Sequence, residues 1–239
     1  VGKTTTAINL ATAMAAIEKK ILIVDSDPQG NASTGLGIDE KDREPNLYRL
    51  LSKGQLEERS IKKTAIPNLD IITATIDLAA SEIELVDIKK REERLKNVLK
   101  EVHDYDYLFI DCPPALGLLT INDLVAADSV IVPLQCEFFA LEGLSALTQT
   151  INIIKEQFNK KLYIEGLVLT MHDKRNTLSD LVEKDVRGYY KNKVYKTIIP
   201  RNVRISEAPS HGKPVLIYDT TCVGSKAYIE LAKEVIFNQ

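Results

Sequence analysis

The sequence predicts an α/β fold, in which a doubly wound, mostly parallel β-sheet carries helices on both faces. Several short runs rich in Ile, Leu and Val lack the apolar–polar alternation of a strand with one solvated face. Helical patterns separate these runs, which is typical of a parallel sheet covered on both sides. No linker rich in Pro, Gly or Ser divides the 239 residues and no internal repeat is present, so we expect a single domain over residues 1–239.

The first half of the chain contains four expected elements. A helical pattern runs from Gly2 to Glu18, and an apolar strand follows at Ile21–Asp25. A second strand is expected at Leu69–Thr73. Apolar positions at helical spacing then predict one long helix at Ser81–His103, whose charged middle is interpreted as a solvated face.

The second half repeats the same alternation of strands and helices. The expected elements are a strand at Tyr107–Asp111, a helix at Leu118–Ala127, a strand at Ser129–Leu134, a helix at Phe139–Phe158, a strand at Gly166–Met171, a helix at Leu178–Tyr190, short strands at Lys196–Pro200 and Val215–Tyr218, and a closing helix at Gly224–Phe237.

The chain opens with Val1-Gly2-Lys3-Thr4, which matches the end of the phosphate-binding pattern G-x-x-x-x-G-K-[ST]. That pattern lies between a strand and a helix, and only the helical side is present here. We therefore expect the domain to be incomplete at its N-terminus, with its first strand missing, and this stretch by itself to be inactive. On these few residues alone, a helix that happens to carry Lys and Thr in its first turn remains an alternative.

Acidic residues stand at the ends of two apolar strands. Asp25 ends the Ile21–Asp25 run and Asp27 follows two residues later. Asp111 ends the Tyr107–Asp111 run. Ligands of open α/β sheets bind at the carboxyl ends of the strands, so these carboxylates point to a nucleoside triphosphatase. The alternative for each one singly is an ordinary turn residue, because Asp is common in turns.

A polyphosphate at this position needs hydrogen-bond donors and positive charge. The start of the first helix offers both, through Gly2, Lys3, Thr4 and Thr5. Mg²⁺ prefers oxygen ligands and keeps several waters. We expect the Thr4 hydroxyl to bind the ion directly, Asp111 to hold a magnesium-bound water and Asp25 to support the surrounding shell.

A catalytic carboxylate is also required, because an attacking water must be oriented. Asp27 is placed for that task, and Lys3 is expected to assist catalysis at the phosphates.

Long strings of the sequence resemble the deviant-Walker ATPases of the ParA/Soj chromosome-partitioning family. They are Gly2-Lys3-Thr4-Thr5-Thr6, the segment 25–31 (DSDPQGN), the segments 111–114 (DCPP) and 116–120 (LGLLT), the segment 135–143 (QCEFFALEG) and the segment 199–214 (IPRNVRISEAPSHGKP). The resemblance follows the same order over nearly the whole chain.

The resemblance implies a cycle driven by ATP and Mg²⁺. An ATP-dependent homodimer binds DNA without sequence preference, and a ParB/Spo0J-type centromere-binding protein stimulates hydrolysis and releases it. The segment Pro200, Arg201 and Asn202 is implied to lie near the base. The family's signature lysine belongs to the stretch before Val1. A cytoplasmic, nucleoid-associated protein is expected.

The net charge of −3 hides an uneven distribution. Residues 186–204 carry six basic side chains and no acidic one, so the remainder of the chain carries −9. A concentrated positive field favours contact with DNA phosphates. The resemblance points to Arg175 and Arg204 as DNA-binding residues. The basic residues that the family usually carries after the Tyr-Asp near the C-terminus are absent from 220–224, and a solvated basic face is the alternative.

Other classes of function fit the sequence less well. A MinD-like, membrane-associated ATPase would need a basic amphipathic C-terminal helix, whereas residues 225–239 have balanced charge, so no membrane partner is expected. An iron–sulfur ATPase would need a suitable cysteine pair, and Cys112, Cys136 and Cys222 have no such spacing. An inactive fragment of the partitioning protein is the third alternative.

Overall fold

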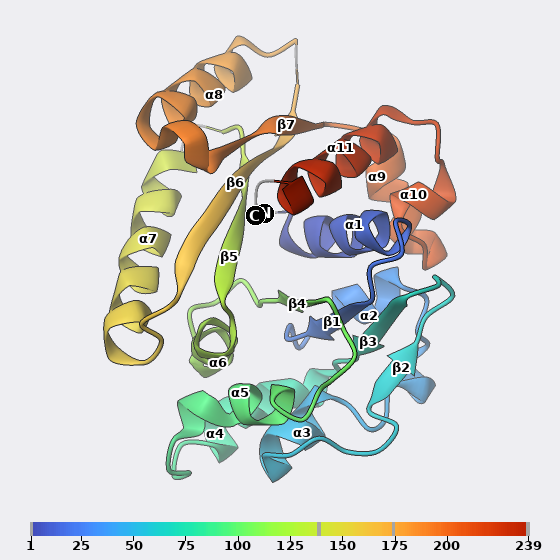
Figure 1. Ribbon diagram of the computed structural model, residues 1–239, viewed down its shortest axis with the longest axis vertical. Helices are drawn as coiled ribbons and strands as arrows, with labels where there is room; N and C mark the ends of the chain where they lie inside the picture. Colours follow the sequence, from blue (N-terminus) through green and yellow to red (C-terminus); the bar gives the residue numbers. More distant parts are fainter. Residues whose placement is uncertain (1, 138–139, 174, 238–239) are drawn as a thin grey trace.

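The computed structural model describes residues 2–137, 140–173 and 175–237 (Figure 1). Val1 and the predicted first residue of the fourth long helix, Phe139, lie outside the described residues. The strands are β1 Ile21–Asp25, β2 Ile61–Lys63, β3 Leu69–Ile72, β4 Tyr107–Asp111, β5 Ser129–Gln135, β6 Tyr163–His172 and β7 Val194–Pro200. The helices are α1 Lys3–Ala15, α2 Asn31–Gly35, α3 Leu47–Lys53, α4 Ser81–Glu84, α5 Arg94–Leu99, α6 Leu118–Ala126, α7 Ala140–Gln157, α8 Thr177–Tyr190, α9 Val203–Glu207, α10 Val215–Tyr218 and α11 Val223–Phe237.

The predicted α/β class with mostly parallel strand pairing is confirmed, but the strands form two sheets. One sheet has the order β2-β3-β1-β4 and the other the order β5-β6-β7. All pairs are parallel except β2 with β3. Within the described residues β4 and β5 are edge strands of their sheets.

The central strand β1 explains why the apolar runs do not alternate. Ile21 and Ile23 pack into the cluster around α1 and α11, whereas Leu22 and Val24 pack into the cluster around α3 and α5. Successive side chains of a strand point to opposite faces, so a strand covered on both faces needs apolar residues at every position.

A single helical layer joins the two sheets. Helices α1 and α11 pack against each other, and their core includes Ile23 of the first sheet and Val168, Tyr195 and Ile199 of the second. Figure 1 shows both helices beside the two sheets, with α7 and α8 on the outer side of β5–β7 and α3, α4 and α5 below β1–β4. The sheets are thus two parts of one layered body.

The helix predicted over Ser81–His103 is wrong as a continuous element. The chain forms α4, then turns, and forms α5 only from Arg94. Lys90 adopts a left-handed conformation with φ of 57°, which a continuing α-helix cannot contain. The apolar pattern spans both pieces, yet Ile83 is 78% exposed whereas Leu95 is fully buried. The Asn122 side chain accepts a hydrogen bond from Leu95 N (3.1 Å), so α6 fixes where α5 begins.

The strand predicted at Val215–Tyr218 is also wrong, because these residues form the helical turn α10. Pro214 precedes the turn, and the Asn9 side chain of α1 accepts a hydrogen bond from Val215 N (2.8 Å). The short elements α2, α3, β2 and α9 were not predicted. The remaining predicted strands and helices are confirmed with ends shifted by a few residues, within the described parts of the chain.

Among the described residues, no helix has both the length and the apolar character that crossing a bilayer requires.

Candidate functional site

The N-terminus of α1 is the positive end of a 13-residue helix. Gly2 precedes it with φ of 80°, a conformation that favours glycine, and its carbonyl accepts the hydrogen bond from Thr6 N (2.9 Å). The first turn contains no acidic residue, and Lys3 and Thr4 are only partly buried. The turn therefore presents backbone N–H groups, a hydroxyl and an ammonium group together.

The carboxyl ends of β1 and β4 lie next to each other. The two strands pair in register, which sets Asp25 opposite Asp111. Ser26 N donates a hydrogen bond to the Asp111 carbonyl oxygen (3.0 Å) and extends the pairing by one residue. Asp27 follows two residues after Asp25, so three of the predicted carboxylates come together at this edge.

The Asp111 carboxylate is buried and lacks a well-formed hydrogen bond. Its side chain is 2% exposed, and neither carboxylate oxygen has a well-aligned donor, although the Thr4 hydroxyl lies close enough to affect it. Burial is the main reason why its pKa rises to about 7, and the nearby charges of Asp25 and Asp27 add to the rise. The Thr4 hydroxyl and the Lys3 ammonium act in the opposite direction, which places both groups beside this carboxylate.

These groups fit a divalent cation. A buried carboxylate without partners is costly, and a bound cation would satisfy it. Asp111 and the Thr4 hydroxyl supply the oxygen donors that Mg²⁺ prefers.

Asp25 is fully buried and bonded to protein groups. Its Oδ2 accepts hydrogen bonds from Ser33 N (2.8 Å) and Ser33 Oγ (2.7 Å), and burial raises its pKa to about 6. These bonds join the end of β1 to α2. Asp25 thus holds the loop after β1 in place, and this is how it can support a metal site.

Asp27 lies in the loop between β1 and α2 and is 7% exposed. Its Oδ1 accepts a hydrogen bond from Gln29 N (3.0 Å). Gly30 closes the loop with φ of 62°. A Cβ at Gly30 would lie 2.4 Å from the guanidinium of Arg43 and 2.9 Å from Ala74 O, so only glycine fits this turn.

A fourth carboxylate, Asp123 of α6, belongs to the same region and was missed from the sequence. Asp123 is buried, and its Oδ1 accepts a hydrogen bond from Ser26 Oγ (2.7 Å). Burial raises its pKa to about 8, with a smaller contribution from Asp111. No sequence signal separates Asp123 from an ordinary helical residue. We call Asp25, Asp27, Asp111 and Asp123 the carboxylate cluster.

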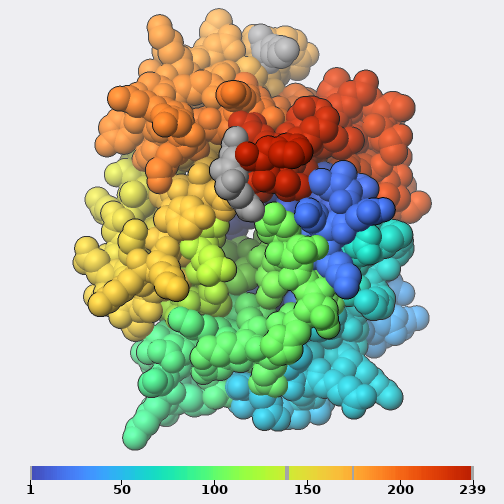
Figure 2. Space-filling model, in the orientation of Figure 1, coloured from blue at the N-terminus to red at the C-terminus, as the bar shows by residue number. Residues whose placement is uncertain are grey.

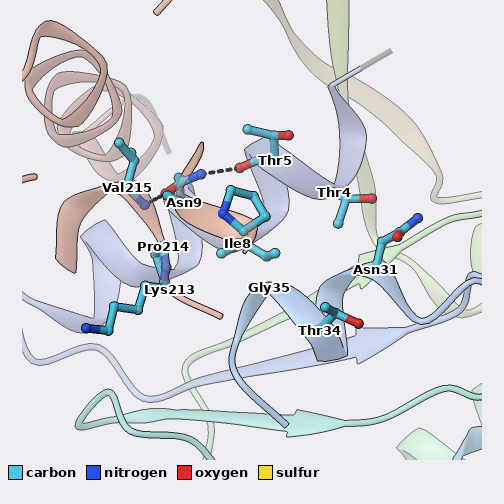
Figure 3. Close-up of a pocket in the computed structure, with 12 residues that line it drawn as sticks. Thr4, Thr5, Ile8, Asn9, Asn31, Thr34, Gly35, Lys213, Pro214 and Val215 are labelled. Atoms are coloured by element: carbon cyan, nitrogen blue, oxygen red, sulfur yellow. Dashed lines mark hydrogen bonds between the residues drawn. The ribbon is translucent and has the colours of Figure 1, made fainter. Parts of the chain in front are cut away.

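A pocket of about 290 Å³ opens beside the first turns of α1 (Figure 3). Thr4 and Thr5 form one wall, Asn31 and Thr34 of α2 form a second, and residues 208–215 close the third. Asn9 lies between the walls in Figure 3, where its side chain donates to Thr5 O and accepts from Val215 N. The pocket is continuous with the predicted phosphate-binding turn.

The segment predicted to lie near the nucleotide base stands at the end of β7 and does not line this pocket. It consists of Pro200, the last residue of β7, with Arg201 and Asn202. Residues 208–215, further along the same resembling string, line it instead. Asn202 Oδ1 is nevertheless buried without a hydrogen-bond partner, and Arg201 N donates to His172 O (2.9 Å).

The two arginines predicted to bind DNA are paired with nearby carboxylates. Arg175 forms a two-pronged contact with Asp173, through Nε (3.0 Å) and a terminal nitrogen (2.9 Å), and lowers the Asp173 pKa to about 2. Arg204 contacts Glu207 (3.0 Å) and Asp219 (3.5 Å). Both side chains remain more than half exposed. The positive charge of each arginine is thus balanced by at least one neighbouring carboxylate.

The basic segment 186–204 is divided between structural and free cations. Arg187 contacts Glu183 and donates to Tyr195 O, and Lys193 donates to Ile164 O. Lys191 and Lys196 are exposed and form no ion pair with any described residue. In Figure 2 the orange surface that contains this segment forms the top of the molecule, away from the blue surface of α1.

Comparison with known sequences finds close relatives over the whole chain. A family model described as an AAA domain matches residues 1–164. Sporulation initiation inhibitor protein Soj of Bacillus subtilis is 54% identical over 239 residues, which cover 100% of this chain and 94% of that protein. Chromosome partitioning protein ParA of Caulobacter vibrioides is 54% identical over 239 residues, covering 99% of this chain and 90% of that protein.

Comparison with solved structures finds the same fold in nucleotide-bound proteins. Cobyrinic acid a,c-diamide synthase from Mycobacterium smegmatis, with bound ADP and magnesium, has a TM-score of 0.84 at 33% identity, covering 98% of this chain and 89% of that one. The septum site-determining protein MinD from Pyrococcus horikoshii, complexed with Mg-ADP, has a TM-score of 0.79 at 25% identity, covering 98% and 90%.

Proposed function

The chain belongs to the ParA/Soj family of chromosome-partitioning ATPases, and on that premise we propose that its carboxylate cluster and the N-terminus of α1 bind ATP with Mg²⁺ and hydrolyse ATP. The observation that carries the proposal is Asp111, whose two buried carboxylate oxygens have no partner beside Lys3 and Thr4. The nucleotide-bound structures of similar fold support the same choice of ligand.

The phosphates bind at the first turn of α1. Gly2, Thr4 and Thr5 supply backbone N–H groups at the positive end of the helix, and Lys3 supplies a positive charge that binds the phosphates. Thr4 and Asp111 would hold the cation, Asp111 through a water, and Mg²⁺ bound there would neutralise negative charge on the phosphate oxygens.

Asp27 orients the attacking water. Its Oδ1 accepts a hydrogen bond from Gln29 N, which gives the carboxylate a defined direction. Asp25 keeps the loop that carries Asp27 in place through its bonds to Ser33. Hydrolysis thus depends on Asp27, and binding depends on the α1 turn.

The coupling of this ATPase to partitioning follows the family cycle. We propose that ATP binding drives a homodimer, that the dimer binds DNA through phosphates without sequence preference, and that a ParB/Spo0J-type partner stimulates hydrolysis and releases it. The exposed, unpaired Lys191 and Lys196 support a phosphate-binding surface in addition to Arg175 and Arg204. The cycle would place the protein on the nucleoid.

A MinD-like membrane function finds less support in the last helix. In α11, Lys233 pairs with Glu230 (2.6 Å), and Glu234 accepts hydrogen bonds from the backbone N–H groups of Lys196 and Thr197. The charges of this helix thus serve the protein itself and do not form a basic face for anionic lipids. Sedimentation with anionic vesicles and ATP tests this, since binding would favour the membrane alternative.

The proposed ATPase is tested by nucleotide binding and turnover. We expect Mg²⁺-dependent binding of a fluorescent ATP analogue and release of phosphate, both lost on addition of EDTA. Asp111→Asn removes the charge that is proposed to hold the cation and should abolish turnover. Asp128→Asn changes an exposed carboxylate between α6 and β5 and serves as the matched control. Turnover of Asp111→Asn at the normal rate would refute the assignment.

A further inference from the structure

Three potential metal ligands gather at the carboxyl end of β6, outside the carboxylate cluster. His172 is the last residue of β6, and Asp180 and Glu183 lie one turn apart on α8. His172 Nε2 is 3.4 Å from Asp180 Oδ1 and 3.3 Å from Glu183 Oε2. The three ligand atoms all lie within 4.8 Å of one another.

The imidazole of His172 is buried without a hydrogen bond. Its side chain is 6% exposed, and Nε2 has no hydrogen-bond partner although two carboxylate oxygens lie close to it. Nε2 of His172 thus faces two carboxylate oxygens without forming a hydrogen bond to either, and a cation bound between the three atoms would satisfy all of them.

The spacing fits a cation. Tetrahedral zinc binds imidazole nitrogen and carboxylate oxygen at about 2.0–2.2 Å, so two such ligands lie about 3.4 Å apart along an edge of the tetrahedron. The two separations from His172 Nε2 have this length. A direct hydrogen bond from a ring nitrogen to a carboxylate would be shorter, about 2.7–2.9 Å.

We propose that His172, Asp180 and Glu183 form a binding site for one Zn²⁺-type transition-metal ion. The imidazole ligand favours zinc and its neighbours over Mg²⁺, which prefers oxygen ligands alone. Asp180 is 64% exposed, so solvent reaches the open side of the site and water completes the coordination. This proposal does not depend on the proposed ATPase activity.

The ion would join strand β6 to helix α8, and hydrogen bonds extend this connection to strand β7. Glu183 offers Oε2 to the site while its Oε1 accepts from Arg187 Nε (2.7 Å), and Arg187 also donates to Tyr195 O of β7. The His172 carbonyl accepts from Arg201 N at the end of β7. A bound ion would therefore fix α8 against β6 and β7, beside the loop that carries Arg175.

The test uses tag-free protein freed of metal with EDTA and then titrated with ZnCl₂ in a calorimeter. We expect one Zn²⁺ per chain and a higher melting temperature, with no comparable rise from MgCl₂. His172→Asn and Glu183→Gln should weaken Zn²⁺ binding at least about 10-fold. Co²⁺ in place of Zn²⁺ should give the visible absorption of a tetrahedral ion, which reports the site without relying on a variant that might misfold.

Two control variants separate this site from others. Asp185→Asn changes an exposed residue of the same helix and should leave Zn²⁺ binding unchanged. Asp111→Asn disables the carboxylate cluster and should also leave it unchanged, so failure of the ATPase proposal would not affect the result. Absence of Zn²⁺ binding, or equal binding by His172→Asn, would overturn the inference.

Discussion

The carboxylate cluster and the two arginines predicted to bind DNA are opposite kinds of charged region. Asp111 is buried with both oxygens unpartnered, and Asp123 is buried with one oxygen unpartnered. Arg175 and Arg204 are exposed, and each contacts at least one carboxylate. In the carboxylate cluster, buried oxygens remain without partners. Each of the two arginines, by contrast, is paired with a carboxylate of the protein itself.

The difference shows which charges report a function. Burying an unpaired charge costs several kcal/mol, so folding tolerates it chiefly where a ligand repays the cost. An exposed ion pair contributes only about 0–1 kcal/mol and forms or breaks easily. Changes in the carboxylate cluster should therefore have large effects, and changes in the arginines small ones.

The largest effect is expected from Lys3→Gln. Loss of the ammonium removes the positive charge beside Asp111 and the phosphates, so ATP turnover should fall at least about 100-fold and ATP-dependent dimerisation should be lost. Phosphate release and sedimentation velocity with ATP measure the two effects. Lys226→Ala, on the exposed side of α11, is the control, and a dimer of Lys3→Gln with ATP would break the comparison.

Asp27→Ala should separate binding from hydrolysis. Because Asp27 orients water and does not hold the phosphates, the variant should bind ATP normally and lose hydrolysis by about 100-fold or more. It should then remain on DNA as a dimer. Fluorescent-nucleotide binding and phosphate release measure this, with Asp39→Ala, an exposed residue, as the control. Normal turnover would exclude Asp27 from its role.

Asp123 should make stability depend on pH. Its folded pKa, about 8, lies above its ordinary value, so the folded state keeps a proton that the unfolded state has already lost between about pH 4 and 8. The free energy of unfolding should fall as pH rises through this range, and Asp111 and Asp25 act in the same direction.

The variant Asp123→Asn tests the size of that effect. Without nucleotide and Mg²⁺, we expect it to reduce the loss of stability between pH 5 and 8 by at least about 1 kcal/mol, or about 2–4 °C in melting temperature. Thermal unfolding followed by circular dichroism at each pH measures it, and Asp128→Asn is the matched control. An unchanged pH profile would mean that Asp123 is solvated.

The smallest effect is expected from Arg204→Ala. Because Arg204 is already paired, DNA binding should weaken only a few-fold, equally for all sequences, with a slope of log affinity against log salt that is smaller by up to about one. Glu207→Gln removes the nearer of the two carboxylate partners of Arg204 and should strengthen binding. Gel shifts across salt concentrations measure both, and a loss in both variants would show that the pair itself is required.

The sequence predicted the strand ends of the site because their signal is local. An apolar run followed by Asp marks the end of β1 and of β4, and both strands lie where expected. The break between α4 and α5 was not predictable, since the apolar spacing continues across it while Ile83 and Leu95 face different surroundings. Asn122, a residue distant in sequence, decides where α5 starts.

The sequence by itself determined the α/β class, the family and the residues of the α1 turn, because these depend on periodicity and on contiguous strings. Only the tertiary structure decided that Asp123 joins the carboxylate cluster, that Arg175 and Arg204 are paired, and that His172 faces two acids of α8. Each of these facts depends on burial or on a partner brought close by folding. Residue type and spacing along the chain contain no direct measure of either.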